Sequence, residues 1–332
     1  MGDLWGYLCV TLEYANFHDI NDKNHCKEFS AVIECDCKAF ASRLEQMLRH
    51  NPSFARRIVV LPSYVLSLRE GLEAALIIGI VLGALRKVHR QDLSRVVWGG
   101  TLSAAAISFI VAIILQGAGA SLEGTAGGAF EGTTVFLAAG VLTWMIFWMH
   151  HQSRTIKSSL ELGVRHAVSQ SGARALFFLA FLAVLREGVE LALFLTATTF
   201  ALNAQQTLIG GILGLGTAIL LGWSLFATTV RLDLRRFFQV TGILLILFAA
   251  GLVAYGVHEF NEIGWIPALV EHVWDINFFL SEQSTVGQML KALFGYNANP
   301  SLTEVLAYAG YFAAITIGLR RSRVTVASMQ NA

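Results

Sequence analysis

Two short charged strings lie inside long apolar stretches of this 332-residue chain. They are Arg69-Glu70-Gly71-Leu72-Glu73 and Arg186-Glu187-Gly188-Val189-Glu190. A Glu or Arg near the centre of a membrane helix costs roughly 2.5–3.5 kcal/mol on insertion scales. Three charges per helix, repeated at the same spacing in a second helix, therefore predict a functional site. The excess of carboxylates indicates a path for cations.

The composition is that of a membrane protein. Hydrophobic residues make up 55% of the chain and charged residues 14%, whereas soluble domains carry about 25% charged residues. The net charge of +1 gives no indication of a nucleic-acid partner, and membrane lipid is the expected surrounding. We predict an all-α polytopic fold with seven transmembrane helices and no strands. The predicted spans are 58–86, 95–116, 129–151, 173–200, 207–230, 236–258 and 304–320.

Lys and Arg residues gather in alternate connections between these spans. One set of connections, together with the C-terminal tail, carries 14 of them, whereas the other set carries only Lys291. Because cytoplasmic loops are enriched in Lys and Arg, the pattern predicts a multi-pass protein of the cell membrane with its N-terminus outside and its C-terminus in the cytoplasm. Arg49, Arg56 and Arg57, before the first span, run against this rule.

Spans one to three resemble spans four to six. The charged strings are 117 residues apart, and Gly99-Gly100 precedes Gly210-Gly211 by 111 residues. Because three is odd, the second copy must cross the membrane in the opposite sense, which predicts an inverted 3+3 repeat plus one extra helix. The expected segments are a disordered or dispensable leader at 1–57, repeats at 58–151 and 173–258, an extracytoplasmic loop at 259–303, the seventh helix at 304–320 and a cytoplasmic tail at 321–332.

The spacing within each string places its two glutamates on one helix face. Glu70 and Glu73 are three residues apart, as are Glu187 and Glu190,. Each string lies about 20 Å along its span, near the membrane midplane. Since the two helices are predicted to be antiparallel, we expect one midplane site of up to four carboxylates, with Arg69 and Arg186 as counter-ions.

Such a site suits hard, highly charged cations, because carboxylate oxygens are hard ligands. No thiolate or methionine cluster lies in these two helices, which argues against copper(I). The glycine in each string allows an ion or a neighbouring helix to approach closely. The competing interpretation is a pair of structural ion pairs that hold helices together.

Further candidate residues lie toward the predicted outer side. Glu131 could receive a cation, or it could be a carboxylate favoured at a helix N-terminus. His258, Glu259 and Glu262 could form an entrance site, or they could be a solvated helix end. The leader could bind zinc, although its spacing matches no standard zinc finger. Its candidate ligands are Cys9, His18, His25, Cys26, Cys35 and Cys37.

The repeated Arg-Glu-Gly-x-Glu, an Arg-Glu-x-x-Glu motif, resembles the signature of the oxidase-dependent iron permeases, also called iron/lead transporters. Phe130-Glu131 and Phe294-Gly-Tyr-Asn also resemble that family, and the resemblance covers about residues 62–320. It implies that Glu70, Glu73, Glu187 and Glu190 bind ferric iron and that uptake is inward. It also implies a separate oxidase or peroxidase and an extracytoplasmic iron-binding partner.

Two alternatives remain at this point. One is a transporter for another cation, such as lead or manganese. The other is a membrane enzyme with a carboxylate-bound di-metal centre, but such sites usually contain Glu-x-x-His, and neither string has a histidine within its span,. We therefore expect no enzyme activity, no catalytic residues and no cofactor, with iron as the transported substrate.

Overall fold

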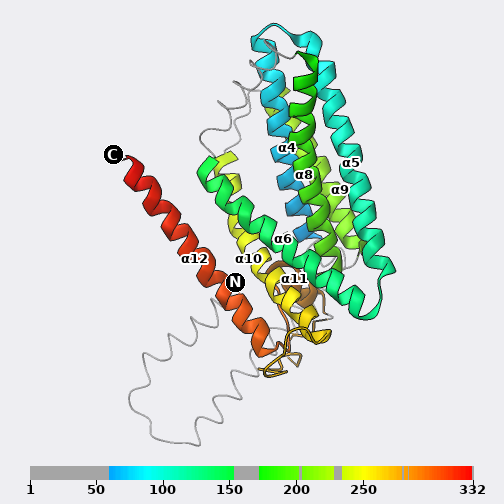
Figure 1. The fold of residues 1–332 in the computed structure, drawn as a ribbon, viewed down its shortest axis with the longest axis vertical. Coiled ribbons are helices and arrows are strands. Elements are labelled where there is room, and N and C mark those ends of the chain that lie inside the picture. The colour runs from blue at the N-terminus through cyan, green and yellow to red at the C-terminus, as the bar shows by residue number, and fades with distance from the viewer. Residues whose placement is uncertain are drawn as a thin grey trace, which may run out of the picture. The chain divides into compact units, whose positions relative to one another are not determined.

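The computed structural model describes residues 60–152, 172–201, 204–227, 234–278, 280–282 and 284–330. The leader at 1–57, with its candidate zinc ligands, lies outside these residues. Within the described residues the chain is helical and contains no strand (Figure 1). The predicted all-α class is therefore confirmed.

In the described part of the chain, seven long helices coincide with the seven predicted apolar runs. Two short helices, η1 (Gln91–Leu93) and α11 (Thr285–Phe294), lie in the connections. Five of the long helices are apolar enough to cross a membrane, namely α5, α6, α9, α10 and α12. Helices α4 and α8 differ from these five in that each carries the three charges of its string in mid-helix. The long helices are α4 (Leu61–Lys87), α5 (Ser94–Ser121), α6 (Gly124–Gln152), α8 (Ala173–Ala201), α9 (Ala204–Ala227), α10 (Leu234–Glu262) and α12 (Leu302–Gln330).

Helices α4 and α9 form one close pair, and α5 and α8 form another. Glycines allow the close approach, because a Cβ on Gly214 would lie 2.4 Å from the carbonyl oxygen of Tyr64, and one on Gly100 would lie 2.5 Å from that of Phe177,. The helices of each pair run parallel, and α4 also packs against α8. The contacts that fix the parallel directions are Gly210 with Ser63 and Gly222 with Ala75 in the first pair, and Gly100 with Phe177 and Gly119 with Phe200 in the second.

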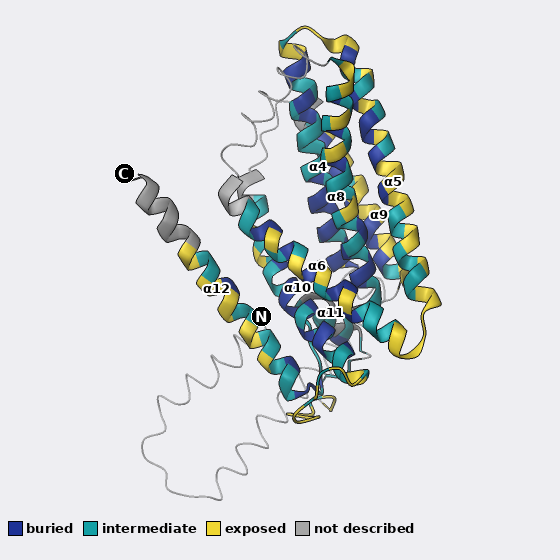
Figure 2. Ribbon diagram, in the orientation of Figure 1, coloured by how far each residue is buried: buried dark blue, intermediate teal, exposed yellow. Residues whose placement is uncertain are grey.

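Helix α6 packs along α10, and α12 packs on α10. The rings of Phe136 and Phe260 stack between α6 and α10 with their centroids 5.4 Å apart. Buried side chains from α4, α6, α8 and α10 form a central apolar cluster, in the darkest part of Figure 2. Its larger members are Leu66, Leu142, Met145, Phe194, Phe248 and Leu252.

Helix α11 was not predicted, because the segment 259–303 was expected to be a loop. The Ser284 side chain accepts a hydrogen bond from the Gly287 amide at the start of the helix,. The helix ends at Gly295, whose φ of 67° lies in the left-handed region that favours glycine,. A Cβ on Gly251 would lie 2.5 Å from the nitrogen of Gly295, so the end of α11 rests directly on the backbone of α10. Gly251 lies roughly 16 Å along α10 from its last residue, Glu262.

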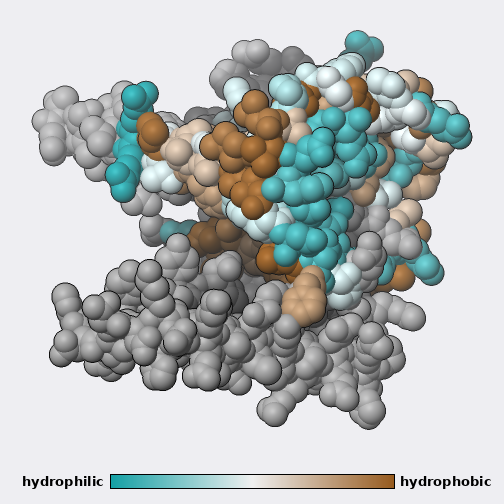
Figure 3. Space-filling model, turned by 90° about the horizontal axis from the view of Figure 1, so that it is seen from below, coloured by the Kyte–Doolittle hydropathy of each residue, from teal (hydrophilic) through white to brown (hydrophobic). Residues whose placement is uncertain are grey.

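The α10–α12 end, where α10 ends and α12 begins, is the lower end in Figure 1. Figure 3 views this end and shows hydrophilic surface beside apolar surface. Glu262, Glu271 and Asp275 are exposed there. At the opposite end, α4 leads into α5 and α8 begins.

Candidate metal centre

Helices α4 and α8 bring the two charged strings together. Glu70, Glu187 and Glu190 each contribute one carboxylate oxygen to a group in which the oxygens lie within 4.8 Å of one another. Glu70 is 1% exposed and Glu187 is 5% exposed. The predicted meeting of residues 117 positions apart is thus present in the structure. The group could hold a metal ion through three hard oxygen ligands.

Each of these three glutamates has a buried oxygen that no hydrogen bond from the described residues satisfies. The Oε2 atoms of Glu70, Glu187 and Glu190 have no hydrogen-bond partner among the described residues. Buried polar atoms are normally hydrogen-bonded, because an unsatisfied one costs about 1–3 kcal/mol and more when it is charged. Three such oxygens on neighbouring side chains therefore have room for a further partner, and a cation would satisfy all three,.

Arg69 binds both glutamates of its own string. Its Nη1 donates to Glu70 Oε1 at 3.1 Å, and its Nη2 lies 2.9 Å from Glu73 Oε1. Nη1 also lies 3.2 Å from the sulfur of Met145 on α6. The Arg69 side chain is 2% exposed. Glu73 is thus held by Arg69 and lies outside the three-glutamate group, although all four glutamates were predicted to act together.

Arg186 occupies the equivalent position in the second string but has different surroundings. Its Nε donates to Glu190 Oε1 at 2.9 Å, whereas it lies 3.9 Å from Glu187 Oε1. The guanidinium lies over the ring of Trp148 on α6, 4.5 Å from the ring centre. Its side chain is 38% exposed. The two counter-ions are therefore not equivalent.

The glycine in each string serves helix packing. A Cβ on Gly71 would lie 2.6 Å from the Cβ of Ala218 on α9, and one on Gly188 would clash with Ser108 on α5. Of the two predicted uses of these glycines, the structure supports the approach of a neighbouring helix.

Comparison with known proteins agrees with these motifs. The model of the iron permease FTR1 family matches residues 60–327. The chain belongs to the iron permease FTR1 family. It is 35% identical to "Ferrous iron permease EfeU" of Escherichia coli O6:K15:H31 over 250 residues, which cover 75% of this chain and 91% of the relative. It is 33% identical to the Yersinia pestis protein of that name, with 75% and 89% covered.

A third relative, from Escherichia coli K12, is named "Putative inactive ferrous iron permease EfeU". It is 35% identical over 250 residues, which cover 75% of this chain and 91% of the relative. No solved structure matches the chain. Because the family consists of permeases, this protein is a membrane transporter and not an enzyme. The expected resemblance to iron permeases is confirmed.

The four residues predicted as an entrance site lie at the α10–α12 end of the permease. The Tyr255 hydroxyl donates to Glu131 Oε1, which joins α10 to α6. Glu259, 9% exposed, lies near Gly128 of α6. His258 Nε2 lies 3.2 Å from Glu262 Oε1. Among the described residues, these four do not form a group with metal-ligand spacing.

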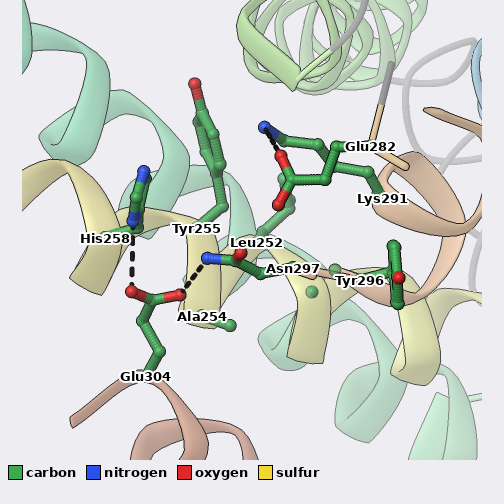
Figure 4. A pocket seen from close by; sticks show the side chains of 11 residues that line it. Leu252, Ala254, Tyr255, His258, Glu282, Lys291, Tyr296, Asn297 and Glu304 are labelled. Atoms are coloured by element: carbon green, nitrogen blue, oxygen red, sulfur yellow. Dashed lines mark hydrogen bonds and ion pairs between the residues drawn. The ribbon is translucent and has the colours of Figure 1, made fainter. Parts of the chain in front are cut away.

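A small pocket adjoins these residues, between α10, α11 and the start of α12 (Figure 4). Glu304 accepts hydrogen bonds from Asn297 Nδ2 at 2.7 Å and Ser301 Oγ at 2.9 Å, and it lies 3.1 Å from His258 Nδ1. Across the pocket, Lys291 Nζ lies 3.6 Å from Glu282 Oε2 and faces the ring of Tyr255. The pocket is therefore lined by paired charges.

Several residues that the structure brings to these sites were not predicted from the sequence. Glu304 had a usable signal, because Ser301 and Glu304 form a Ser-x-x-Glu capping box at the start of α12, with each side chain bonding the other's backbone N–H,. Met145 and Trp148 had none, because their contacts with the arginines depend on how α6 packs across α4 and α8. Tyr255 lies one helical turn from Glu259, but its bond to Glu131 depends equally on packing.

Proposed function

We propose that this permease imports iron across the cell membrane through the site formed by Glu70, Glu187 and Glu190. The observation that carries the proposal is the set of three buried Oε2 atoms without hydrogen-bond partners among the described residues, on side chains whose oxygens lie within 4.8 Å of one another. A cation is the partner that such oxygens require. Membership of an iron permease family, with relatives named iron permeases, supports iron as that cation.

Arg69 and Arg186 act as resident counter-ions in this proposal. Each forms an ion pair with the last glutamate of its own string, at 2.9 Å in both cases. Glu73 completes the set as a fourth carboxylate, which reaches the ion when the pairing with Arg69 loosens. An arriving cation weakens both pairings because it competes for the same carboxylates.

We propose seven membrane spans related by an inverted repeat, with α12 as the extra helix. The repeat relates α4 to α8, α5 to α9 and α6 to α10. It therefore relates the α4–α9 pair to the α8–α5 pair, and both pairs are close contacts. The motif glycines obey the same exchange, since Gly71 meets α9 and Gly188 meets α5. In this topology α4 and α8 also cross the membrane, and their charges face each other rather than lipid.

The proposed orientation places the α10–α12 end outside the cell. The distribution of Lys and Arg supports it, since Lys291 is the one basic residue in the connections assigned to that side,. The C-terminus is then cytoplasmic. Iron would enter past Glu131, His258, Glu259 and Glu262, which act in turn because they do not form one ligand group.

We further propose that a separate oxidase or peroxidase supplies the iron as the ferric ion, with an extracytoplasmic iron-binding protein as a second partner. The exposed Glu262, Glu271 and Asp275 at the α10–α12 end support docking of such partners and attraction of cations,. Hard carboxylate ligands favour the ferric ion. The competing assignment is ferrous iron, which the names of the relatives specify for those proteins.

The test is uptake of radiolabelled iron into cells that lack their own high-affinity system. Glu70, Glu73, Glu187 and Glu190 are each changed to Gln, and the amount of each variant in the membrane is measured. We expect all four to lose uptake, with E70Q, E187Q and E190Q losing most. Normal uptake by all four variants at normal membrane levels would contradict the site.

Two supply conditions separate the oxidation states. Iron is offered with ascorbate, which keeps it ferrous, or as ferric citrate together with a ferrous chelator. Uptake that persists with the ferrous chelator supports the ferric assignment. Uptake that requires ascorbate and stops with the chelator supports ferrous iron instead.

A further inference from the structure

The two counter-ions of the candidate metal centre are exposed to different degrees. The side chain of Arg69 is 2% exposed, and that of Arg186 is 38% exposed. Arg69 contacts both glutamates of its string within 3.1 Å, whereas Arg186 holds Glu190 closely and leaves Glu187 at 3.9 Å. Arg69 is thus shielded and bound to both glutamates of its string, which is called the closed arrangement. Arg186, at the equivalent position of the repeat, is partly exposed and close to one glutamate, which is called the open arrangement.

Helix α6 provides a separate contact for each arginine. Met145 lies against Arg69, and Trp148, three residues later and on the same helix face, lies under Arg186,. A guanidinium over an indole ring is attracted by the ring's quadrupole, and Trp is the best aromatic partner for this interaction. The ring thus offers Arg186 a support that is not a carboxylate.

The open arrangement lies on one side of the site. Toward the α10–α12 end, the central apolar cluster, with Leu66 and Phe194, is packed between the charged strings and the pocket. Arg186 precedes Glu187 and Glu190 on α8, which places it toward the end where α8 begins. Trp148, four residues before the last residue of α6, lies under the guanidinium of Arg186. Arg186 therefore stands where the site meets its surroundings.

We propose that Trp148 is a positioning residue that holds the guanidinium of Arg186 away from Glu187 and so keeps the carboxylate of Glu187 open to the metal. The inference rests on the proposed function. Without the ring, Arg186 would bind Glu187 and Glu190 together, because arginine and carboxylates form strong paired hydrogen bonds. Arg186 would then compete with the ion for Glu187 and Glu190, which are two of the ion's three ligands. In this proposal the ion also leaves the site past the Arg186 side chain.

The test compares variants of Trp148 that keep or lose an aromatic ring. W148L and W148M lack the ring, W148F and W148Y retain it, and iron uptake is measured as apparent KM and maximal rate per molecule in the membrane. We expect W148L and W148M to raise KM roughly tenfold, and W148F and W148Y to raise it less than about threefold. The matched control is W144L, because Trp144 lies one turn away on α6 and is 69% exposed. W144L should leave KM unchanged.

Equal KM values for the ringless and the aromatic variants would overturn the proposal. Should the ringless variants fail to reach the membrane, increasing fluorination of the indole at position 148 weakens the ring's quadrupole at nearly constant shape. KM should then rise with each fluorine, and a constant KM would equally overturn the proposal. Failure here is distinct from failure of the proposed function, since that is decided by the four Glu→Gln variants.

Discussion

Glu70 and Glu187 are 117 residues apart in the sequence, yet their carboxylate oxygens lie within 4.8 Å of each other. Both side chains are almost fully buried, and each keeps one oxygen without a hydrogen-bond partner among the described residues. Like charges at this distance repel strongly in a medium of low dielectric constant. Such an arrangement is unfavourable for folding alone, which is the reason to expect a ligand there.

E187Q should stabilise the metal-free permease while it weakens metal binding. The change removes a buried negative charge beside Glu70 and Glu190, so we expect the free energy of unfolding to rise by about 1–2 kcal/mol. Loss of a ligand should lower metal affinity by at least about tenfold. Thermal melting in detergent, with and without metal, measures both effects. If the strings were structural ion pairs, E187Q would lower the melting temperature and leave metal binding alone.

E73Q should differ from E187Q in both respects. Glu73 is paired with Arg69 at 2.9 Å and lies outside the three-glutamate group. Its neutralisation removes a carboxylate partner of the buried Arg69, so the metal-free permease should lose stability. Its metal affinity should fall less than that of E187Q. The same melting and binding measurements decide this, and a loss of affinity equal to that of E187Q would place Glu73 among the direct ligands.

G71A should destabilise the permease through the α4–α9 contact. A Cβ at this position would lie 2.6 Å from that of Ala218, and overpacking of this kind costs about 1–3 kcal/mol. The matched control on the same helix is G83A, because a Cβ on Gly83 meets nothing within 4 Å. The melting temperature should fall for G71A alone, and A218G should partly restore it. Equal melting temperatures for G71A and G83A would contradict the close packing.

E304A should destabilise the α10–α12 end. It removes the acceptor shared by Asn297, Ser301 and His258, and loss of one partner in a buried charged network costs about 3–5 kcal/mol,. E262Q is the control, because the Glu262 side chain is 64% exposed although it also pairs with His258,. Thermal melting should separate the two variants clearly. Similar small effects would show that Glu304 is not essential to this network.

A chain that begins at Met47 should transport iron as the full chain does. The family match begins at residue 60, so the candidate site and the seven long helices among the described residues lie after the deletion. Uptake per molecule in the membrane is the measurement. A large fall in uptake at an unchanged membrane level would assign a role to the first 46 residues and their cysteines.

The helices and the meeting of Glu70 with Glu187 could be predicted because both depend on patterns along the chain. Apolar runs of sufficient length give the helices, and equal spacing of charges in two of them gives the pairing. The difference between Arg69 and Arg186 could not be predicted, because their motifs are nearly identical in sequence. Met145 and Trp148 create that difference, and their positions depend on how α6 crosses two other helices.

Helix α11 was missed for a related reason. Its ten residues are too few for a membrane span, and its place is determined by Gly251, which is distant in the sequence. The four residues predicted as an entrance site were grouped by their proximity in the chain and at one helix end. The structure does not gather them into one ligand group, because Glu131 bonds Tyr255 and His258 pairs with both Glu262 and Glu304.

The contact between Gly251 and Gly295 also bears on how the surface of this protein can be mapped. The two backbones touch roughly 16 Å from the end of α10,. An epitope tag or reporter inserted within 285–297 would have to separate them. It would unfold this segment and yield no signal or a false one. Residues 267–275 are mostly exposed and accept such an insertion more readily,. A tag placed there reports the true side of the membrane, although both stretches belong to the same connection.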